Sequence, residues 1–243
     1  MDPKGKVALI TGGARIGKAV AKALAARGCA LALTYKMSRA AAEESALEAK
    51  AAGVQAIVLK ADATEDAEVA AAVKETAESL GRLDILVNMA SLYVKTPDSS
   101  AADWSATVDA NAKSAFLFTI HTAPIMKAAG AGRIINISDW LPVSGRPRYK
   151  GYTPYYASKA AVVALSESFA LELAPEILVN SIAPGPILAP PDLTPEQNAS
   201  VVKVVPLARW GGSDEIAKAV MFLVDSDFVT GECIRVDGGR HLY

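Results

Sequence analysis

Short apolar runs alternate along this chain with longer segments that have helical periodicity, and this alternation constrains the fold more than any other feature. The runs cover residues 7–10, 30–34, 54–59, 84–89, 133–138, 177–182 and 233–236. A continuous apolar run is typical of a strand that is covered on both faces. Strands joined through helices form right-handed crossovers and a parallel sheet. The sequence therefore predicts an α/β fold, in which a doubly wound parallel sheet of about seven strands carries helices on both faces.

The segments between the runs are predicted to be helical. They extend from Ile16 to Gly28, from a cap at Ser38 to Gly53, from Thr64 to Gly81, from Ser99 to about Ala129 with a possible break before Asn111, from about Pro154 to Ala174, and from Ser213 to about Asp225. The stretches 140–154 and 184–212 are irregular, and the second is proline-rich and long, as lids often are. We expect a single domain over residues 1–243 with a substrate lid at about 186–212.

The composition argues against several classes of protein. Hydrophobic residues make up 51% of the chain, and 25 basic residues balance 26 acidic ones, which argues against a nucleic-acid partner. No apolar run approaches the ~18 residues of a membrane helix, and the N-terminus lacks a signal-peptide pattern. Cys29 and Cys233 offer no disulfide framework, although they could pair, and two histidines offer no metal site. We expect a cytoplasmic protein without a metal or a membrane partner.

A glycine-rich turn, Thr11–Gly17, follows the first predicted strand and precedes the first predicted helix. In this context glycines let the backbone approach a pyrophosphate, and the helix N-terminus supplies N–H donors and the positive end of its dipole. The turn therefore predicts a dinucleotide site. The alternative is a tight turn without a ligand, because short glycine motifs also occur by chance.

The end of the second predicted strand distinguishes the two nicotinamide dinucleotides. Enzymes that select the plain ribose place an Asp or Glu there, but segment 34–39 (TYKMSR) contains no carboxylate. Groups that suit a 2′-phosphate are present instead, on Arg15, Lys36, Ser38 and Arg39. We therefore predict NADP(H) rather than NAD. The alternative is that these cations belong to the solvated start of a helix.

Tyr155 and Lys159 are four residues apart, so they share one face of the predicted helix. A phenol has a pKa near 10 and is a poor acid at neutral pH. A cation one turn away, together with a positive nicotinamide ring, is expected to lower that pKa and make Tyr155 a proton donor. The spacing alone can arise by chance. The prediction therefore depends on its position after the fifth strand of a nucleotide-binding sheet.

Taken in order, these motifs resemble the short-chain dehydrogenase/reductase family over essentially the whole chain. The matching elements are the Thr11–Gly17 turn, Asp62, Asn88-Met89-Ala90, Asn111, Tyr155 with Lys159, Pro184-Gly185, and Val236-Asp237-Gly238-Gly239. The resemblance implies a Rossmann-like sheet with strand order 3-2-1-4-5-6-7 and, commonly, a homotetramer.

The resemblance also implies roles for individual residues. Tyr155 donates the proton, Lys159 holds the nicotinamide ribose and acidifies Tyr155, and Asn111 supports a water that links Lys159 to solvent. Asp62 contacts the adenine, Asn88 and Ala90 pass along a ribose, and Pro184-Gly185 borders the nicotinamide. The expected cofactor-binding residues are Gly12, Arg15, Ile16, Gly17, Tyr35, Lys36, Ser38, Arg39, Asp62, Ala63, Asn88, Ala90, Ser91, Pro184 and Gly185.

The chain departs from the family pattern in the turn and after the fourth strand. Gly17 comes one residue early and the middle glycine is absent, so either the turn is rebuilt or one residue is missing. Met89 and Ser91 stand where the family has Asn and Gly.

A third departure concerns the family's catalytic serine. Alignment puts Asp139 at that position and Ser138 one residue before it. A serine donates a hydrogen bond to a carbonyl oxygen that gains negative charge, whereas an ionised aspartate suits a substrate that is cationic. Asp139 with Tyr155 and Lys159 resembles the pteridine and dihydromonapterin reductase branch. The alternative is that Asp139 caps a helix and Ser138 acts on the substrate. Ser138, Trp140 and Tyr149 are the expected substrate contacts, with Trp140 stacking on a flat ring.

The sequence leaves three functions to be tested. The first is an NADPH-dependent oxidoreductase that transfers hydride to a C=N or C=O bond of a small, pterin-like substrate, with Tyr155, Lys159, Asp139 and Asn111 as its catalytic residues. The alternative is a carbonyl reductase of the 3-oxoacyl-carrier-protein reductase type, for which serine rather than Asp139 is expected. The third is a non-catalytic NADP-binding sensor, against which the presence of Tyr155, Lys159 and Asn111 argues.

Overall fold

Seven parallel strands form one sheet in the predicted order β3-β2-β1-β4-β5-β6-β7. The structure is a computed structural model and describes residues 1–12, 14–145, 149–190 and 193–243. The strands are β1 Val7–Thr11, β2 Ala30–Tyr35, β3 Ala56–Lys60, β4 Ile85–Asn88, β5 Gly132–Ile137, β6 Ile177–Pro184 and β7 Cys233–Val236. The predicted doubly wound α/β fold is confirmed.

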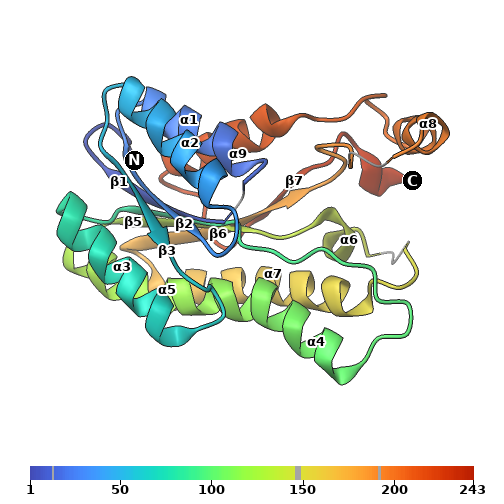
Figure 1. The fold of residues 1–243 in the computed structure, drawn as a ribbon, viewed down its shortest axis with the longest axis horizontal. Coiled ribbons are helices and arrows are strands. Elements are labelled where there is room, and N and C mark those ends of the chain that lie inside the picture. The colour runs from blue at the N-terminus through green and yellow to red at the C-terminus, as the bar shows by residue number, and fades with distance from the viewer. Residues whose placement is uncertain (13, 146–148, 191–192) are drawn as a thin grey trace.

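Helices cover both faces of this sheet (Figure 1). One layer contains α1 (Gly17–Ala26), α2 (Arg39–Ala51) and α9 (Ser213–Asp225), and the other contains α3 (Asp66–Leu80), α5 (Ser114–Ala128) and α7 (Thr153–Leu173), with α4 (Ala101–Val108) packed on α7. Because side chains alternate along a strand, Ile10 packs in the first layer's core and Leu9 in the second's. None of the helices in the described ranges has the length and apolarity needed to cross a membrane.

The order of the strands reverses direction at β1. This strand pairs with β2 on one side and β4 on the other, so Thr11 is in register with both Thr34 and Asn88. In open α/β sheets, ligands bind outside the carboxyl ends of the strands at such a switch point. The glycine turn after β1 lies at this point of the sheet.

Two helical segments differ from their predicted form. α3 begins at Asp66 rather than Thr64, because the Thr64 hydroxyl and backbone N–H both donate to the Asp62 carboxylate in a turn. The expected break before Asn111 is a π-helical turn, Asp109–Lys113, which joins α4 to α5 without interrupting the helical path.

The two irregular stretches are also more ordered than predicted. The first contains a one-turn helix, α6 (Trp140–Val143). In the second, β6 continues to Pro184 and α8 occupies Pro195–Lys203. The Thr194 hydroxyl accepts from the Gln197 N–H, and the Gln197 side chain accepts from the Thr194 N–H, so a capping box begins α8.

Candidate active site

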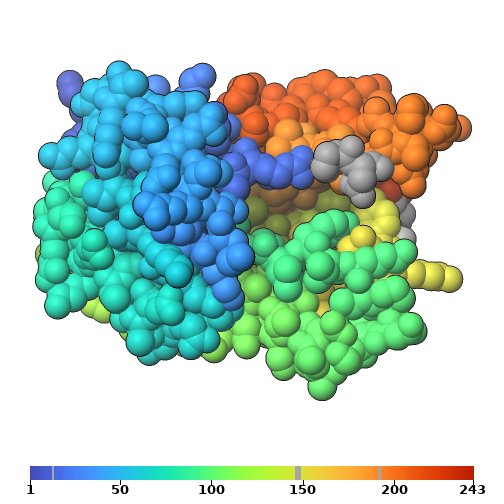
Figure 2. All heavy atoms as spheres, viewed as in Figure 1, coloured from blue at the N-terminus to red at the C-terminus, as the bar shows by residue number. Residues whose placement is uncertain are grey.

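A cavity of about 1420 Å³ opens at the carboxyl ends of the central strands. Figure 2 shows it as a hollow between the blue N-terminal layer, the green segment that follows β4 and the orange segment near α8. Common ligand pockets occupy ~300–1,000 Å³, so this one has room for a dinucleotide beside a second small molecule.

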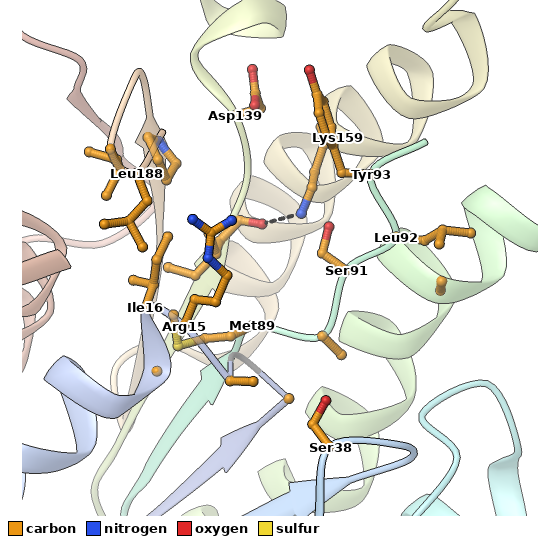
Figure 3. Close-up of a pocket in the computed structure, with 18 of the residues that line it drawn as sticks. Arg15, Ile16, Ser38, Met89, Ser91, Leu92, Tyr93, Asp139, Lys159 and Leu188 are labelled. Atoms are coloured by element: carbon orange, nitrogen blue, oxygen red, sulfur yellow. Dashed lines mark hydrogen bonds between the residues drawn. The ribbon is translucent and has the colours of Figure 1, made fainter. Parts of the chain in front are cut away.

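Most of the predicted site residues line this cavity. They are Gly12, Arg15, Ile16, Gly17, Tyr35, Lys36, Ser38, Asp62, Ala63, Ala90, Ser91, Ser138, Asp139, Trp140, Tyr149, Tyr155, Lys159, Pro184 and Gly185. Figure 3 shows Arg15, Ser91 and Lys159 facing the same space. Gly13 of the predicted turn lies outside the described residues.

Three predicted residues do not line the cavity. The Arg39 guanidinium pairs with Glu43 on the exposed face of α2. The Asn88 side chain is buried between strands and donates to Asn136 Oδ1 at 2.8 Å. Asn111 is buried as well and acts on its neighbours rather than on the cavity. The strand pattern predicted where these residues lie in the fold but not which way Asn88 points.

The turn between β1 and α1 brings backbone close to backbone. Gly12 has a φ of +61°, and a Cβ there would lie 3.0 Å from the Ala90 Cα. α1 begins at Gly17 with no side-chain cap and no acidic residue in its first turn. Its first N–H groups therefore remain available to an anion, which is the geometry that binds a pyrophosphate.

The far end of the cavity contains a mixed set of charges. Lys36, at the end of β2, forms an ion pair with Asp62 beyond β3. Burial alone would raise the pKa of Asp62, but the Lys36 ammonium and the Thr64 hydrogen bonds outweigh it and lower that pKa. Ser38 lines the cavity beside them and makes no side-chain cap to α2.

Tyr155 and Asp139 are hydrogen-bonded to each other at the cavity floor. The Tyr155 hydroxyl donates to Asp139 Oδ2 at 2.8 Å. Lys159 is 2% exposed, its Nζ donates to the Ile137 carbonyl at 2.8 Å, and it lies 5.9 Å from the Tyr155 ring centroid. Figure 3 marks the Lys159 bond with a dashed line. The predicted i, i+4 pair thus faces one site.

Burial shifts the pKa values of Tyr155, Asp139 and Lys159. Burial and then the Asp139 carboxylate raise the pKa of Tyr155 well above its usual value. Burial also raises the pKa of Asp139, against the opposing hydrogen bonds from Leu141 and Tyr155. Burial lowers the pKa of Lys159 to about 8, although Asp139 opposes the shift. The predicted acidification of Tyr155 involves Lys159 together with a bound nicotinamide ring, and the chain alone does not produce it.

Ser138 and Asp139 point to different sides of the β5 end. The buried Ser138 hydroxyl donates to the Lys159 carbonyl at 2.8 Å, inside the structure. Asp139 caps α6, accepting from the Leu141 N–H at 2.8 Å through Oδ1, while Oδ2 receives the Tyr155 hydroxyl. Asp139 is therefore both the helix cap and the group beside Tyr155, two roles that the sequence presented as alternatives.

Asn111 connects two parts of the site from inside the π-helical turn. Its Oδ1 accepts from the Leu92 N–H at 2.6 Å, and its Nδ2 donates to the Leu92 carbonyl and to the Ser158 hydroxyl. The Ser158 hydroxyl in turn donates to the Tyr155 carbonyl. Asn111 thus ties the loop after β4 to the start of α7.

Aromatic side chains surround Tyr155. Tyr93 meets its ring edge-on at 4.8 Å between centroids and stacks on Tyr152 at 5.0 Å. Tyr149 contacts both Tyr152 and Trp140 edge-on. Sequence reasoning missed Tyr93, because nothing in the loop after β4 signalled that it reaches across to α7.

The segment proposed as a lid lies against the glycine turn. Arg15 Nη2 donates to the Ala189 carbonyl at 3.0 Å, across the cavity. Further along, the Trp210 indole donates to Asn198 Oδ1 on α8 at 2.6 Å. Ile187, Leu188 and Leu193 add apolar lining on this side.

Comparison with known proteins identifies the family. A family model described as "Enoyl-(Acyl carrier protein) reductase" matches residues 13–241. The "3-oxoacyl-[acyl-carrier-protein] reductase" of Synechocystis sp. is 36% identical over 246 residues, with 98% of each chain covered. A solved short-chain dehydrogenase/reductase from Serratia marcescens has a TM-score of 0.91 at 32% identity and covers 99% of this chain and 100% of that chain. The chain belongs to the short-chain dehydrogenase/reductase family.

Two further solved structures are described with the phosphorylated cofactor. The NADPH-dependent 3-quinuclidinone reductase of Rhodotorula rubra has a TM-score of 0.92 at 31% identity, covering 100% of this chain and 93% of that chain. A blue fluorescent protein from a metagenomic library, in complex with NADPH, has a TM-score of 0.89 at 33% identity and covers 99% of each chain. As a short-chain dehydrogenase/reductase, this chain is an oxidoreductase of a family that binds NAD(P). The comparisons do not show the pteridine reductase branch.

Proposed function

We propose that this short-chain dehydrogenase/reductase is an NADPH-dependent reductase of a C=O or C=N bond in a small substrate. The observation that carries the proposal is the Tyr155 hydroxyl, bonded to Asp139 at 2.8 Å in the cavity that also contains the glycine turn. Lys159 lies at the same floor, and its ammonium is fixed by the Ile137 carbonyl. A hydroxyl, a cation and a glycine turn thus line one cavity.

The preference for NADP(H) rests on the chain's charges. Segment 34–39 offers no carboxylate to a ribose hydroxyl, while Arg15, Lys36 and Ser38 line the cavity near it. The two relatives described with NADPH support this choice. In this assignment, Gly12, Ile16 and Gly17 would hold the pyrophosphate, Arg15, Lys36 and Ser38 the 2′-phosphate, Tyr35, Asp62 and Ala63 the adenosine, and Ala90, Ser91, Lys159, Pro184 and Gly185 the nicotinamide half.

In this mechanism, a bound reduced nicotinamide supplies the hydride. Tyr155 gives its hydroxyl proton to the substrate oxygen or nitrogen. The resulting phenolate would lie 2.8 Å from Asp139, and two like charges at that distance in a buried site repel strongly. An Asp139 that is protonated beforehand avoids this repulsion. It passes its own proton to Tyr155, so the pair carries one negative charge instead of two. The Lys159 ammonium stabilises the remaining negative charge.

The comparisons favour a 3-oxoacyl thioester as the substrate. The Synechocystis relative is described as a 3-oxoacyl-[acyl-carrier-protein] reductase and is 36% identical to this chain. Such a substrate needs a hydrogen-bond donor where the family has serine. A carboxylic acid kept neutral by burial can be that donor, and burial raises the pKa of Asp139. Neutral Asp139 is therefore compatible with carbonyl reduction.

Asp139 also favours a second candidate, a pterin-like substrate with a protonatable C=N bond. An ionised Asp139 would stabilise the positive charge of such a ring, and Tyr93, Tyr149 and Tyr152 provide an aromatic wall beside it. The comparisons give this candidate no support, so it rests on the site alone.

One assay separates the candidates. The absorbance of NADPH is followed with an acetoacetyl thioester and, in parallel, with a dihydropterin. Faster oxidation with the thioester supports the oxoacyl reductase, and faster oxidation with the pterin supports the second candidate. Tight NADPH binding without turnover of any carbonyl or imine substrate would instead favour a sensor and contradict the proposal.

We also propose a homotetramer, as is common in this family. Apolar side chains are exposed on α5 and α7, among them Phe116, Ile120 and Leu171. The Phe116 ring lies 5.8 Å from that of Phe169, so apolar side chains of the two helices meet beside the exposed ones. Such a face supports association with another copy of the chain.

A further inference from the structure

The short helix α6, which Asp139 caps, packs against the last residues of the sequence. We call residues 233–243, which comprise β7 and the residues after it, the C-terminal segment. Two arginines of this segment contact α6. The Arg240 guanidinium carbon lies 4.9 Å from the centroid of the Trp140 ring, which is 4% exposed. At the other end of α6, Arg235 Nη2 donates to the Val143 carbonyl at 2.6 Å.

Arg240 is buried, and the indole ring is a principal partner of its charge. The residue is 8% exposed, and its Nε has no hydrogen-bond partner among the described residues. Its Nη1 donates to the Tyr243 carbonyl at 3.4 Å, which is a long bond. A guanidinium over an indole face is attracted to it, and the attraction is greater when water is excluded. Arg240 therefore restrains the position of the Trp140 ring.

Asp237 gives the C-terminal segment its own rigidity. Its buried carboxylate accepts from the backbone N–H groups of Gly239 and His241 and pairs with the His241 ring. The same residue packs against Gly185, where a Cβ would come within 2.5 Å of the Asp237 Cβ. The segment thus packs against the cavity lining at Gly185 as well as against α6.

We propose that Arg240 is a positioning residue for Asp139, acting through Trp140 to hold α6 so that Asp139 keeps its bonds to the Leu141 N–H and the Tyr155 hydroxyl. The inference rests on the proposed function, because it takes Asp139 as part of the reacting site. Asp139 and Trp140 are consecutive, so a shift of the ring moves the helix cap.

Other charged groups also act on Asp139. Among the described residues, the titratable side chains that act on Asp139 are Tyr155 and Lys159 from α7 and Tyr93 from the loop after β4. Tyr149 and Tyr152, just before α7, line the same cavity, and Arg240 contacts the neighbouring Trp140. Removing Arg240 is expected to loosen the two hydrogen bonds that favour the ionised carboxylate. That change moves the Asp139 titration to higher pH.

The first experiment does not depend on activity. In a Trp104→Phe/Trp210→Phe background, Trp140 is the one remaining tryptophan of the sequence, so its emission reports on the neighbouring carboxyl. The pH dependence that disappears in Asp139→Asn is assigned to Asp139. We expect its midpoint to rise in Arg240→Met and to return toward the parent value in Arg240→Lys, which keeps the cation. An unchanged midpoint in Arg240→Met overturns the proposal.

The second experiment measures the coupling between the two residues. Arg240→Met is expected to lower kcat about tenfold with little change in NADPH affinity, because sub-ångström misplacement of a catalytic group is costly. In an Asp139→Asn background the same change should have less than about a twofold effect, because coupled sites are not additive. An equal loss in both backgrounds means a general structural role and overturns the proposal.

A control variant accompanies both experiments, and a failure of this proposal can be told from a failure of the proposed function. Arg27→Gln removes an exposed arginine that pairs with Asp225, far from the cavity lining, and should change neither readout. If the parent enzyme reduces neither substrate, the proposed function fails. The emission titration still decides whether Arg240 acts on Asp139.

Discussion

The Tyr155 hydroxyl and the Asp139 carboxyl share a hydrogen bond of 2.8 Å at the floor of the cavity. Burial raises the pKa of both groups, because it disfavours both charged forms. In the proposed mechanism, the proton that reaches the substrate is therefore drawn from a pair of acids. The i, i+4 spacing had predicted a single phenol, acidified by lysine together with a bound nicotinamide ring.

Replacing Tyr155 with phenylalanine should stop turnover without affecting the cofactor. The ring and its edge-on contact with Tyr93 remain, but the transferable proton is lost. General acid catalysis typically contributes ~10²–10⁴-fold, so we expect kcat to fall by at least about a hundredfold. NADPH affinity, measured by nicotinamide fluorescence, should change less than about twofold. Loss of NADPH binding would show that Tyr155 is structural instead.

Changing Asp139 to serine restores the family's hydroxyl donor. Above the pKa of Asp139, this variant should raise kcat/KM for an acetoacetyl thioester relative to a dihydropterin, because a hydroxyl can donate to a developing oxyanion and an ionised carboxylate cannot. The ratio of the two kcat/KM values at several pH values is the measurement. In the parent enzyme, thioester reduction should decline as pH rises through the raised pKa of Asp139 and its proton is lost. The serine variant should lack that decline, and an identical pH profile would contradict a neutral Asp139 as donor.

Lys159 should make stability depend on pH in the alkaline range. Its pKa is lowered to about 8 in the folded chain, against about 10.4 unfolded. Between these values the unfolded chain binds the extra proton, so stability rises with pH across that window. The free energy of unfolding of the Lys159→Met variant and of the parent is measured in urea from pH 7 to 11. The variant's value minus the parent's should be larger at pH 7 than at pH 11, by on the order of 3 kcal/mol. A parent–variant difference that is constant with pH would contradict the buried ammonium.

Arg15 should influence which dinucleotide is preferred. Its guanidinium reaches across the cavity to the Ala189 carbonyl, from where it can turn to a 2′-phosphate. Arg15→Gln should weaken NADPH binding about tenfold, as the loss of a charge-assisted bond does, and leave NADH binding nearly unchanged. Fluorescence titration with both cofactors gives the two values. Equal losses for both would place Arg15 away from the 2′-phosphate.

The apolar face on α5 and α7 predicts how the chain associates. Leu171 is 85% exposed there, and Leu171→Glu should reduce the tetramer to smaller species in light scattering, because a buried charge at an interface is costly. Leu47→Glu, at an exposed position on α2, is the matched control and should leave the tetramer intact. A monomeric parent protein would contradict the assembly itself.

The sequence predicted the sheet and most of the cavity because both follow local patterns. Continuous apolar runs marked the strands, and the ends of those strands then placed Gly12, Ala90 and Tyr155 at one edge. What it missed depends on side-chain direction. Asn88 follows the strand pattern, but its amide turns inward to Asn136. Tyr93 reaches α7 from a loop that has no periodicity.

The pKa shifts of the site residues were the hardest property to predict from the sequence. A sequence shows that Tyr155 and Lys159 are one helical turn apart, but it does not show how completely each is removed from water. In the structure, desolvation is the largest influence on the pKa of both residues. The position of Asp139, which is set by a strand end, then adds the second influence on Tyr155.

The reversal of strand order at β1 has a consequence for how such a protein can change over time. In the proposed mechanism, proton transfer depends on Asp139 after β5 and on α7. Lys36 follows β2, Asp62 follows the edge strand β3, and Arg240 follows β7 at the opposite edge of the sheet. If these proposed roles hold, substitutions after β2 and β3 change the choice of coenzyme, and substitutions after β7 change the pKa of Asp139. Neither has to pass through the interior strands, so the two properties are free to diverge separately.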